Sequence, residues 1–270
     1  MLDVSSPSEN MQRAKGRAEV GYGARGLKHL YQSGCSKVLL PQNFQPVPEA
    51  VIINTSGGVT GGDRLEYSAA VQDGAALSVT TQAAERIYRA SSGEGLITNT
   101  LTLDTESRLE WIPQETILFE ESALKRQLNV TMDESASLLA LETLVLGRKA
   151  MGETLQHARL SDQWRIRRGE RLIYADALRF SEPEAETQSS ATLNGHRALA
   201  TLVYVAPDAE DRLAHARRLL RFEGVEAAAS AWNGILTLRF LAADAQPLRK
   251  ALISFLTEFR GCDLPRVWHM

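Results

Sequence analysis

Cysteine, histidine and aromatic residues are scarce in this chain of 270 residues, which has 2 cysteines, 5 histidines and 6% aromatic residues. No two histidines stand three to five positions apart, and no H-E-x-x-H, C-x-x-C or G-x-S-x-G motif occurs. The sequence therefore lacks the local signatures of zinc enzymes, dithiol redox proteins and serine hydrolases. The distant Cys35 and Cys262 are expected to be free thiols in a reducing compartment, with joint ligation of a soft metal as the open alternative.

Strong net charge and long apolar runs are also missing. A net charge of −3 gives no bulk attraction to nucleic acid or to an anionic membrane, and no apolar run reaches membrane-spanning length. Residues 1–10 are polar and lack the basic-then-apolar layout of a signal peptide. We therefore expect a cytoplasmic protein whose partners include neither nucleic acid nor a membrane.

Glycine, by contrast, is concentrated in one short segment. Gly57, Gly58, Gly61 and Gly62 fall within six positions, and Asp63 follows them directly. Glycine is used where the backbone takes a positive φ or approaches another group closely. The segment therefore predicts a tight, shaped loop between two strands.

The spacing of Gly57 and Gly62 also matches the start of a phosphate-binding loop, which continues with Lys and Ser or Thr. Asp63 and Arg64 stand in those positions instead, and a carboxylate there would repel phosphate. Two interpretations of Asp63 stay open: it caps nearby backbone amides, or it has a direct functional role. A second pattern, G-x-G-x-x-G at residues 21–26, has no apolar strand before it, which disfavours a dinucleotide site.

Most of the chain has the pattern of short β-strands. Residues 1–20 are interpreted as a mobile lead-in to one domain over residues 21–270, whose β array spans residues 35–180. The expected strands cover residues 38–40, 50–54, 67–71, 77–81, 96–103, 108–112, 116–119, 124–131, 138–146, 160–167 and 171–180. This predicts a mainly β fold, built as a sandwich, a barrel or a stacked-strand β-helical array. No fixed sequence period decides among them.

The pattern changes after a polar break at residues 181–195, which we expect to be an exposed loop. Residues 196–260 predict a small α/β element with the order strand, helix, strand, helix. The strands are expected at residues 198–205 and 235–241, and Asp208 is expected to cap the first helix. Pro247 can occupy the first turn of the last helix and Gly261 can end it. The apolar stripe of that helix, expected to be core, comprises Leu248, Leu252, Phe255 and Phe259.

Several carboxylates interrupt apolar strands and are candidate functional groups. Glu142 and Asp176 lie inside apolar runs, Glu110 and Glu115 flank a Trp-Ile-Pro-Gln segment, and Glu153 follows Met-Gly. A buried charge is unfavourable unless it is paired or coordinated. Pairing with an arginine, for which Arg148 and Arg179 are available, is one interpretation. The other is that the carboxylates line a wet interior, where oxygen donors suit the passage of a divalent cation.

Five segments, in order, resemble the urease accessory protein D family, also called UreD or UreH. The resemblance runs from about residue 16 to the C-terminus. Many members have Pro where Ser56 stands, so the turn into the glycine-rich loop is less rigid here. The segments are residues 56–63, residues 80–89, residues 109–115 with Phe119, residues 146–148 with 152–153, and residues 264–268.

The resemblance implies a non-enzymatic scaffold for activating nickel urease. Members bind apo-urease and recruit accessory protein F, which holds the nickel-carrying GTPase, accessory protein G. The fold implied is a β-rich stack of strands, and an internal tunnel is thought to pass Ni²⁺ without any permanently bound cofactor. By motif position, Asp63, Glu142, Arg148, Glu153 and Asp176 are expected near the route. The other motif residues are Gly57, Gly58, Gly61, Gly62, Tyr88, Glu110 and Glu115.

Weak oxygen donors fit such a route, because an ion in transit must bind strongly enough to enter and weakly enough to leave. Two alternatives remain. One is a passive interaction module without a metal path. The other is a β-fold hydrolase with paired carboxylates as acid and base, which the low aromatic content disfavours because sugar platforms are aromatic.

Overall fold

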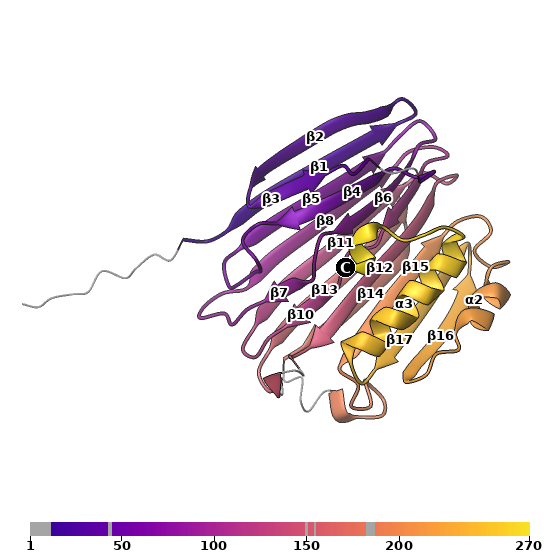
Figure 1. The fold of residues 1–270 in the computed structure, drawn as a ribbon. Coiled ribbons are helices and arrows are strands. Elements are labelled where there is room, and N and C mark those ends of the chain that lie inside the picture. Colours follow the sequence, from indigo (N-terminus) through magenta and orange to yellow (C-terminus); the bar gives the residue numbers. More distant parts are fainter. Residues whose placement is uncertain (1–11, 43–44, 149–150, 154, 182–186) are drawn as a thin grey trace, which may run out of the picture.

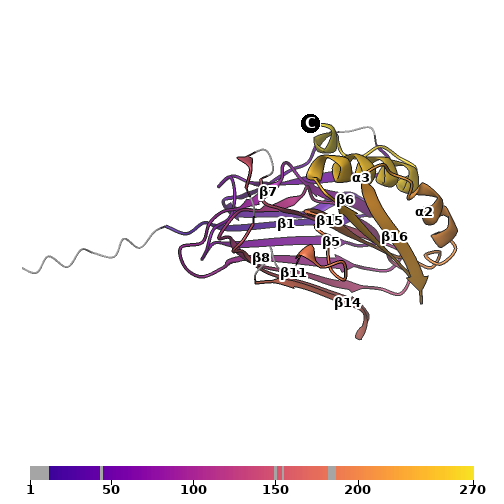
Figure 2. The same cartoon turned by 90° about the horizontal axis from the view of Figure 1, so that it is seen from below.

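The structure, a computed structural model, describes residues 12–42, 45–148, 151–153, 155–181 and 187–270. Residues 1–11 of the expected lead-in and residues 182–186 of the expected loop lie outside this part. In the described part, two β-sheets lie face to face and helices cover the outer face of one of them (Figures 1 and 2). Side chains that point inward from the two sheets therefore share one interior.

Sheet A has seven strands in the described chain. They are β1 (Lys15–Gly23), β2 (Gly26–Gly34), β5 (Arg64–Val71), β8 (Gly95–Leu103), β11 (Ala123–Met132), β13 (Arg159–Arg168) and β14 (Arg171–Phe180). Their order across the sheet is β14-β13-β11-β8-β5-β1-β2. Neighbours from β1 to β13 are parallel, and β2 and β14 close the two edges as antiparallel strands.

Sheet B has ten strands in the described chain, with β7 and β10 forming a short side branch on β12. They are β3 (Ser36–Leu39), β4 (Glu49–Asn54), β6 (Ala76–Thr81), β7 (Glu85–Ile87), β9 (Arg108–Trp111), β10 (Thr116–Leu118), β12 (Ser137–Leu146), β15 (Ala198–Val205), β16 (Val225–Trp232) and β17 (Ile235–Ala242). The main order is β16-β17-β15-β12-β9-β6-β4-β3.

Between β4 and β13 the chain passes back and forth between the sheets, so each coil adds one parallel strand to each sheet. The crossover that parallel strands require is thus supplied by a strand of the opposite sheet and not by a helix. This is the stacked-strand arrangement, and the prediction of a mainly β fold with a small helical part near the C-terminus is confirmed.

Strand β12 shows how a charged residue enters the core. All its residues after the first are buried, because sheet A covers one face and the helices cover the other. Leu138 and Leu144 belong to the core between the sheets, whereas Leu139 and Leu141 belong to the core beneath the helices. Since side chains alternate along a strand, Glu142 points into the space between the sheets.

Helix α3 (Ala245–Arg260) packs on sheet B together with α2 (Leu213–Leu219). The Asp244 side chain accepts a hydrogen bond from the Ala245 amide at 2.7 Å, and Gly261 ends the helix with a φ of 68°. The expected apolar stripe of α3 is buried as predicted. The 3₁₀ helix η2 (Arg266–His269) follows, and its Trp268 indole donates to the Ile112 carbonyl.

Three expectations about elements were wrong. Residues 15–20 belong to β1 and not to a lead-in. Gly16, on the same face of β1 as buried Ala18 and Val20, weakens its apolar alternation. Strand β16 was missed because its alanines carry little β propensity; three of the four pack beneath the helices. Asp208 does not cap α2, which begins at Leu213; its carboxylate accepts from the Tyr204 hydroxyl.

The expectation of free thiols is confirmed, since Cys35 and Cys262 form no disulfide. The predicted strand at residues 96–103 is also confirmed, and Ile97, Asn99 and Leu101 share its buried face. Among the described residues, none of the helices has the length and apolar character needed to cross a membrane.

A buried ion pair ties the end of α3 to sheet B. Arg260 donates from Nε and Nη2 to Glu110 Oε2 at 3.0 and 2.7 Å, and the two side chains are only 5% and 6% exposed. Near the start of the same helix, Arg249 pairs with Glu115 at 2.9 Å. Glu110 and Glu115 therefore hold a helix in place, which is the arginine-pairing interpretation.

We expect Arg260→Met to lower the free energy of unfolding by about 3 kcal/mol, because Glu110 would keep its burial and lose its main partner. Denaturant unfolding measures this. The matched control is Arg165→Met on the exposed face of sheet A, which should stay within about 0.5 kcal/mol of wild type. Equal stability of the two variants would contradict the proposed anchoring.

Candidate functional site

Glu142 lies at the centre of a polar group inside the otherwise apolar space between the sheets. Its carboxyl is 4% exposed, and Oε1 accepts hydrogen bonds from Trp111 Nε1 at 3.1 Å and from Asn99 Nδ2 at 3.2 Å. Oε2 forms an ion pair with Arg126. Strands β8, β9, β11 and β12 thus supply one residue each, and the group forms only when both sheets are in register.

Arg126 is shared between two carboxylates. Besides Glu142, it holds Asp162 of β13 through Nε at 3.1 Å and Nη2 at 2.6 Å, and Nη1 donates to Thr116 Oγ1 at 3.0 Å. The Arg126 side chain is 4% exposed. One guanidinium facing two ionised carboxylates leaves one unit of negative charge uncompensated in the interior.

That uncompensated charge is reflected in the pKa of Glu142. Burial raises this pKa from the ordinary 4.5 to about 7, Arg126 opposes the rise and the neighbouring charge of Asp162 adds to it. The two carboxylates also keep the pKa of Arg126 above its ordinary value despite burial. The interior therefore favours an additional positive charge, whether a proton or a cation.

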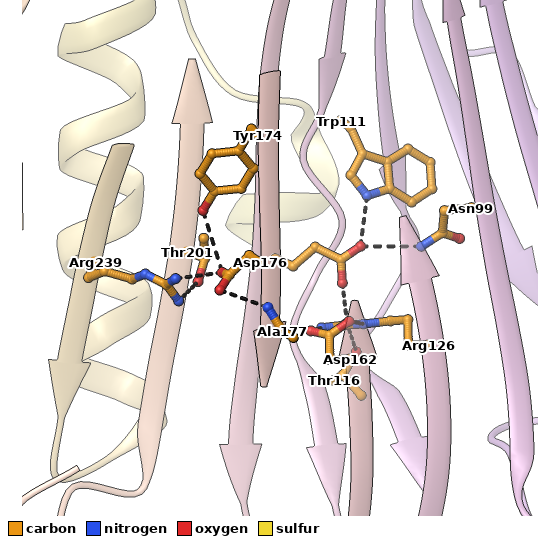
Figure 3. Close-up of polar contacts among 11 residues, drawn as sticks. Asn99, Trp111, Thr116, Arg126, Asp162, Tyr174, Asp176, Ala177, Thr201 and Arg239 are labelled. Carbon is orange, nitrogen blue, oxygen red and sulfur yellow. Dashed lines mark hydrogen bonds and ion pairs between the residues drawn. The ribbon is translucent and has the colours of Figure 1, made fainter. Parts of the chain in front are cut away.

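Asp176 lies at the open edge of the same space, on β14. It pairs with Arg239 of β17 at 2.5 Å, and Arg239 also donates to Thr201 Oγ1 at 2.7 Å. In Figure 3, Asp176 and Arg239 lie on the opposite side of the group from Asn99. The Arg239 side chain is 47% exposed, so this pair stands between the interior and solvent.

Glu85, on β7, is a second acid facing the interior. Asn54 Nδ2 donates to both of its carboxyl oxygens at 3.0 and 3.3 Å. Burial raises the pKa of Glu85 to about 7, against the lowering effect of the Asn54 hydrogen bond. Burial, reinforced by the Glu85 charge, also raises the pKa of the neighbouring Tyr67.

Three adjoining cavities link these groups. The loop cavity, about 120 Å³, is bordered by Asn54, Gly57, Tyr67 and Glu85, and exposed Gln82 and Arg86 stand at its rim. The central cavity, about 30 Å³, shares Tyr67 and Glu85 with it and continues to Asn99, Trp111, Arg126 and Glu142.

The edge cavity, about 10 Å³, shares Arg126 and Glu142 with the central cavity and ends at Asp176 and Arg239. Its volume corresponds to about one water molecule. A series of cavities, each with charged side chains in a partly apolar lining, thus crosses the space between the sheets and narrows toward the edge. Across the described chain, no group of three or more His, Cys, Asp and Glu residues is gathered as a metal site.

The motif residues of the glycine-rich loop meet a different set of partners, here called the loop-end cluster: Gly57, Gly58, Tyr88, Phe119, Arg148 and Glu153. The Tyr88 hydroxyl donates to the Gly57 carbonyl at 3.1 Å, and a Cβ on Gly58 would stand 2.2 Å from the Tyr88 ring. Gly61 is required for a similar reason, because its Cβ would meet the Ser92 carbonyl at 2.1 Å. The glycines therefore allow close packing at one end of the sheets.

The cluster continues from Tyr88 to an ion pair. Phe119 packs edge-on against Tyr88, and the Arg148 guanidinium lies 4.2 Å from the centre of the Phe119 ring. Arg148 donates to Glu153 at 3.0 and 2.9 Å, and these hydrogen bonds lower the pKa of Glu153 to about 2. Glu153 also accepts from the Glu120 amide, so it fastens the chain after β12.

Asp63 has the capping role that the sequence left open. Oδ1 accepts from the Ala14 amide at 2.7 Å and Oδ2 from the Thr60 amide at 2.8 Å, while the side chain is 5% exposed. Gly62, at a φ of 89°, packs against the Arg13 side chain. Asp63 thereby ties the strand entering sheet A to the glycine-rich loop.

Asp63 and Glu153 border none of the three cavities just described. Both carboxylates are engaged at the loop end by backbone amides or an arginine, and their expected place near an internal route stays a prediction. Glu142 and Asp176 do border the cavities. Arg148 belongs to the loop-end cluster.

Sequence reasoning missed Glu85, Arg126, Asp162 and Arg239. Glu85 lies inside one of the resembling segments, residues 80–89, and the alternation of β11 and β13 places Arg126 and Asp162 on their buried faces. Charged residues at apolar positions of alternating strands were therefore the available signal. The sequence pattern gave no such signal for Arg239, because this residue occupies an exposed position of β17.

We expect Asp63→Asn to lower the free energy of unfolding by about 1–3 kcal/mol, because one buried backbone N–H would lose its acceptor. Hydrogen exchange at the Ala14 and Thr60 amides should become faster. Asp73→Asn, in an exposed turn, is the control and should change neither quantity. Unchanged amide protection in Asp63→Asn would refute the cap.

The pKa of Glu85 gives stability a defined pH dependence. The folded-state pKa of about 7 exceeds the ordinary 4.5, so the folded state binds the proton more tightly. The stabilising contribution is complete below about pH 4.5 and is lost as the pH rises through 7. Relative to Glu85→Gln, wild type should lose up to about 3 kcal/mol between pH 5 and 8.

Denaturant unfolding at pH 5, 6, 7 and 8 measures the difference. The value of 3 kcal/mol is an upper limit, because the Glu85 side chain keeps some contact with solvent. Glu66→Gln on the outer face of β5 is the control, and its free energy of unfolding should change with pH in parallel with that of wild type. Parallel curves for Glu85→Gln and wild type would show that Glu85 titrates normally.

Comparison with known proteins gives one consistent result. The family model described as "UreD urease accessory protein" matches residues 14–269. The chain is 46% identical to a protein named urease accessory protein UreD of Rhizobium leguminosarum bv. trifolii, over 99% of both chains. It is also 46% identical to a protein of the same name from Jannaschia sp., over the full length of both. A third, from Xanthobacter autotrophicus, is 45% identical over 95% of this chain and 90% of its own.

Proposed function

The chain belongs to the UreD family of urease accessory proteins, and from this premise we propose that it delivers Ni²⁺ into apo-urease through the space between its two sheets. In this role the protein is a scaffold and catalyses no reaction itself. It binds apo-urease and accessory protein F, which in turn holds the GTPase accessory protein G. These partners are the ones that the family resemblance implies.

The three adjoining cavities are the observation that supports a route for the ion. Each is bordered by a carboxylate: Glu85 in the loop cavity, Glu142 in the central cavity and Asp176 at the edge. Nickel accepts oxygen donors but prefers imidazole and thiolate. Carboxylates spaced along the three cavities therefore offer the ion successive weak sites, from which it can leave again.

Protonation adds a second property to this route. The pKa values of Glu85 and Glu142 both lie near 7, so each carboxyl can hold a proton when no cation is near and release it when one arrives. The empty route then carries little net charge, which limits the cost of burying its carboxylates. Cation entry and proton release are thereby coupled.

A specific observation favours a second candidate, a passive interaction module without a metal path. The edge cavity has room for about one water molecule and is bordered by two arginines, Arg126 and Arg239. A hydrated cation could pass only if the Asp176–Arg239 pair opened. In the passive role, the interior ion pairs would serve only to hold the two sheets in register.

Variants that remove the charge of a carboxylate but keep its side-chain volume distinguish the two candidate functions. We expect Glu142→Gln and Glu85→Gln each to lower the nickel content and activity of urease about tenfold when the chain is co-expressed with urease and the other accessory proteins. At 4 Å, one unit charge in a partly dehydrated site is worth several kcal/mol to a cation, so a tenfold effect is a conservative expectation. Metal analysis of purified urease and a urea hydrolysis assay measure it.

Glu66→Gln, an exposed carboxylate on the outer face of β5, is the matched control and should leave nickel loading unchanged. Pull-down of accessory protein F by each variant shows whether the docking role survives. Normal nickel loading with Glu142→Gln and Glu85→Gln, in variants that still bind accessory protein F, would reject the route and favour the passive module.

A further inference from the structure

The end of the molecule opposite the glycine-rich loop carries a surface hollow of about 500 Å³. Four connections border it: the β11–β12 turn, the β13–β14 hairpin, the segment after β15 and the β16–β17 turn. Its charged residues are Arg168 and Arg171 of the hairpin and Glu134 of the first turn. It shares no lining residue with the three interior cavities.

Arg168 is anomalous among the arginines of the described chain. Its Nε and Nη2 are buried and have no hydrogen-bond partner, whereas buried Arg126 and Arg260 each hold a carboxylate. A buried donor without an acceptor is unfavourable, so each such case requires an explanation. Both atoms are closed to solvent in this conformation, so an acceptor on a ligand in the hollow would reach them only after the Arg168 side chain turns outward.

The surrounding residues that the structure describes hold the Arg168 guanidinium in place but accept no hydrogen bond from its Nε or Nη2. A Cβ added to Gly234 would lie 3.6 Å from both Nη atoms of Arg168, so the guanidinium rests over the backbone of the β16–β17 turn. The nearby acids do not pair with it within the described residues: Glu134 borders the hollow, and Glu210 accepts from the Gly234 amide at 3.1 Å. Its fixed fork of donors suits a carboxylate, which can accept two hydrogen bonds.

The size and lining of the hollow indicate a protein ligand. A volume of about 500 Å³ is far larger than a free oxyanion needs and leaves room for a carboxylate side chain together with flanking groups. Leu172 in the lining is 43% exposed. Trp232, 41% exposed, pairs with Ile235 across the hairpin, so the two share a face, and Ile235 also lines the hollow.

We propose that this hollow is a docking site for an acidic side chain flanked by apolar residues on a partner protein, with Arg168 as the main contact of the carboxylate. Arg171 adds a second positive charge at the rim. Leu172 and Trp232 supply apolar surface to the neighbours of the acid. The proposal is independent of the nickel route.

Binding can be tested on the purified full chain by calorimetric titration. The probes are a blocked peptide with one glutamate between two leucines, the same peptide with glutamine, and inorganic phosphate. We expect the glutamate peptide to bind at least about tenfold more tightly than the glutamine peptide. Arg168→Gln and Arg171→Gln should weaken the glutamate peptide, and Arg165→Gln, an exposed arginine on the same strand, should not.

A stability measurement separates a docking role from a structural one. Arg168→Met keeps the length of the side chain and removes the unpaired donors, so its melting temperature should equal or exceed that of wild type while peptide binding is lost. A fall in melting temperature would assign Arg168 a structural role. Equal affinity for both peptides, no binding up to about 10 mM, or binding of phosphate alone would each overturn the proposal.

Discussion

The interior of this protein depends on the sharing of Arg126 between Glu142 and Asp162. The arginine joins β11 and β13 of sheet A to β12 of sheet B, so it fixes the register of the two sheets as well as the polarity of the space between them. Two carboxylates for one guanidinium make that space selective for a positive charge. With equal numbers of each, the group would be a closed structural pair and would offer nothing to a passing ion.

The polar and glycine-rich groups of the chain divide into two regions with different tasks. The loop-end cluster and Asp63 use glycines, aromatic rings and an ion pair to close one end of the strand stack, and nearly all their polar groups are paired. The interior cavities hold Glu85 and Glu142, whose pKa values are raised by burial. Polar groups that all have hydrogen-bond or ion-pair partners make the loop end rigid. Carboxyls with a pKa near 7, in contrast, can release a proton when a cation approaches. Asn54 connects the two regions, because its amide donates to both Gly58 and Glu85.

The predicted elements show why strands with a strong apolar pattern were found and strands rich in small residues were not. Strands such as β8 and β12 have periodic or continuous apolar patterns because one or both faces are covered by other layers. Strands β1 and β16 are rich in Gly or Ala, since close neighbours leave little room for larger side chains, and the same property removes the pattern by which they would be recognised. Helix α3 was found because Pro247 in its first turn and Gly261 at its end are local signals.

The sequence by itself determined the mainly β class, the glycine-rich turn, the last helix and the family, because each rests on neighbouring residues or on ordered motifs. It also indicated that Glu142 and Asp176 interrupt apolar strands. Only the tertiary structure decided that these acids share cavities with Glu85 and Asp162, while Asp63 and Glu153 serve backbone and arginine partners elsewhere. The physical reason is that the face on which a side chain points follows from local alternation. The partners that the side chain contacts on that face depend on the register between strands that are tens of residues apart in the sequence.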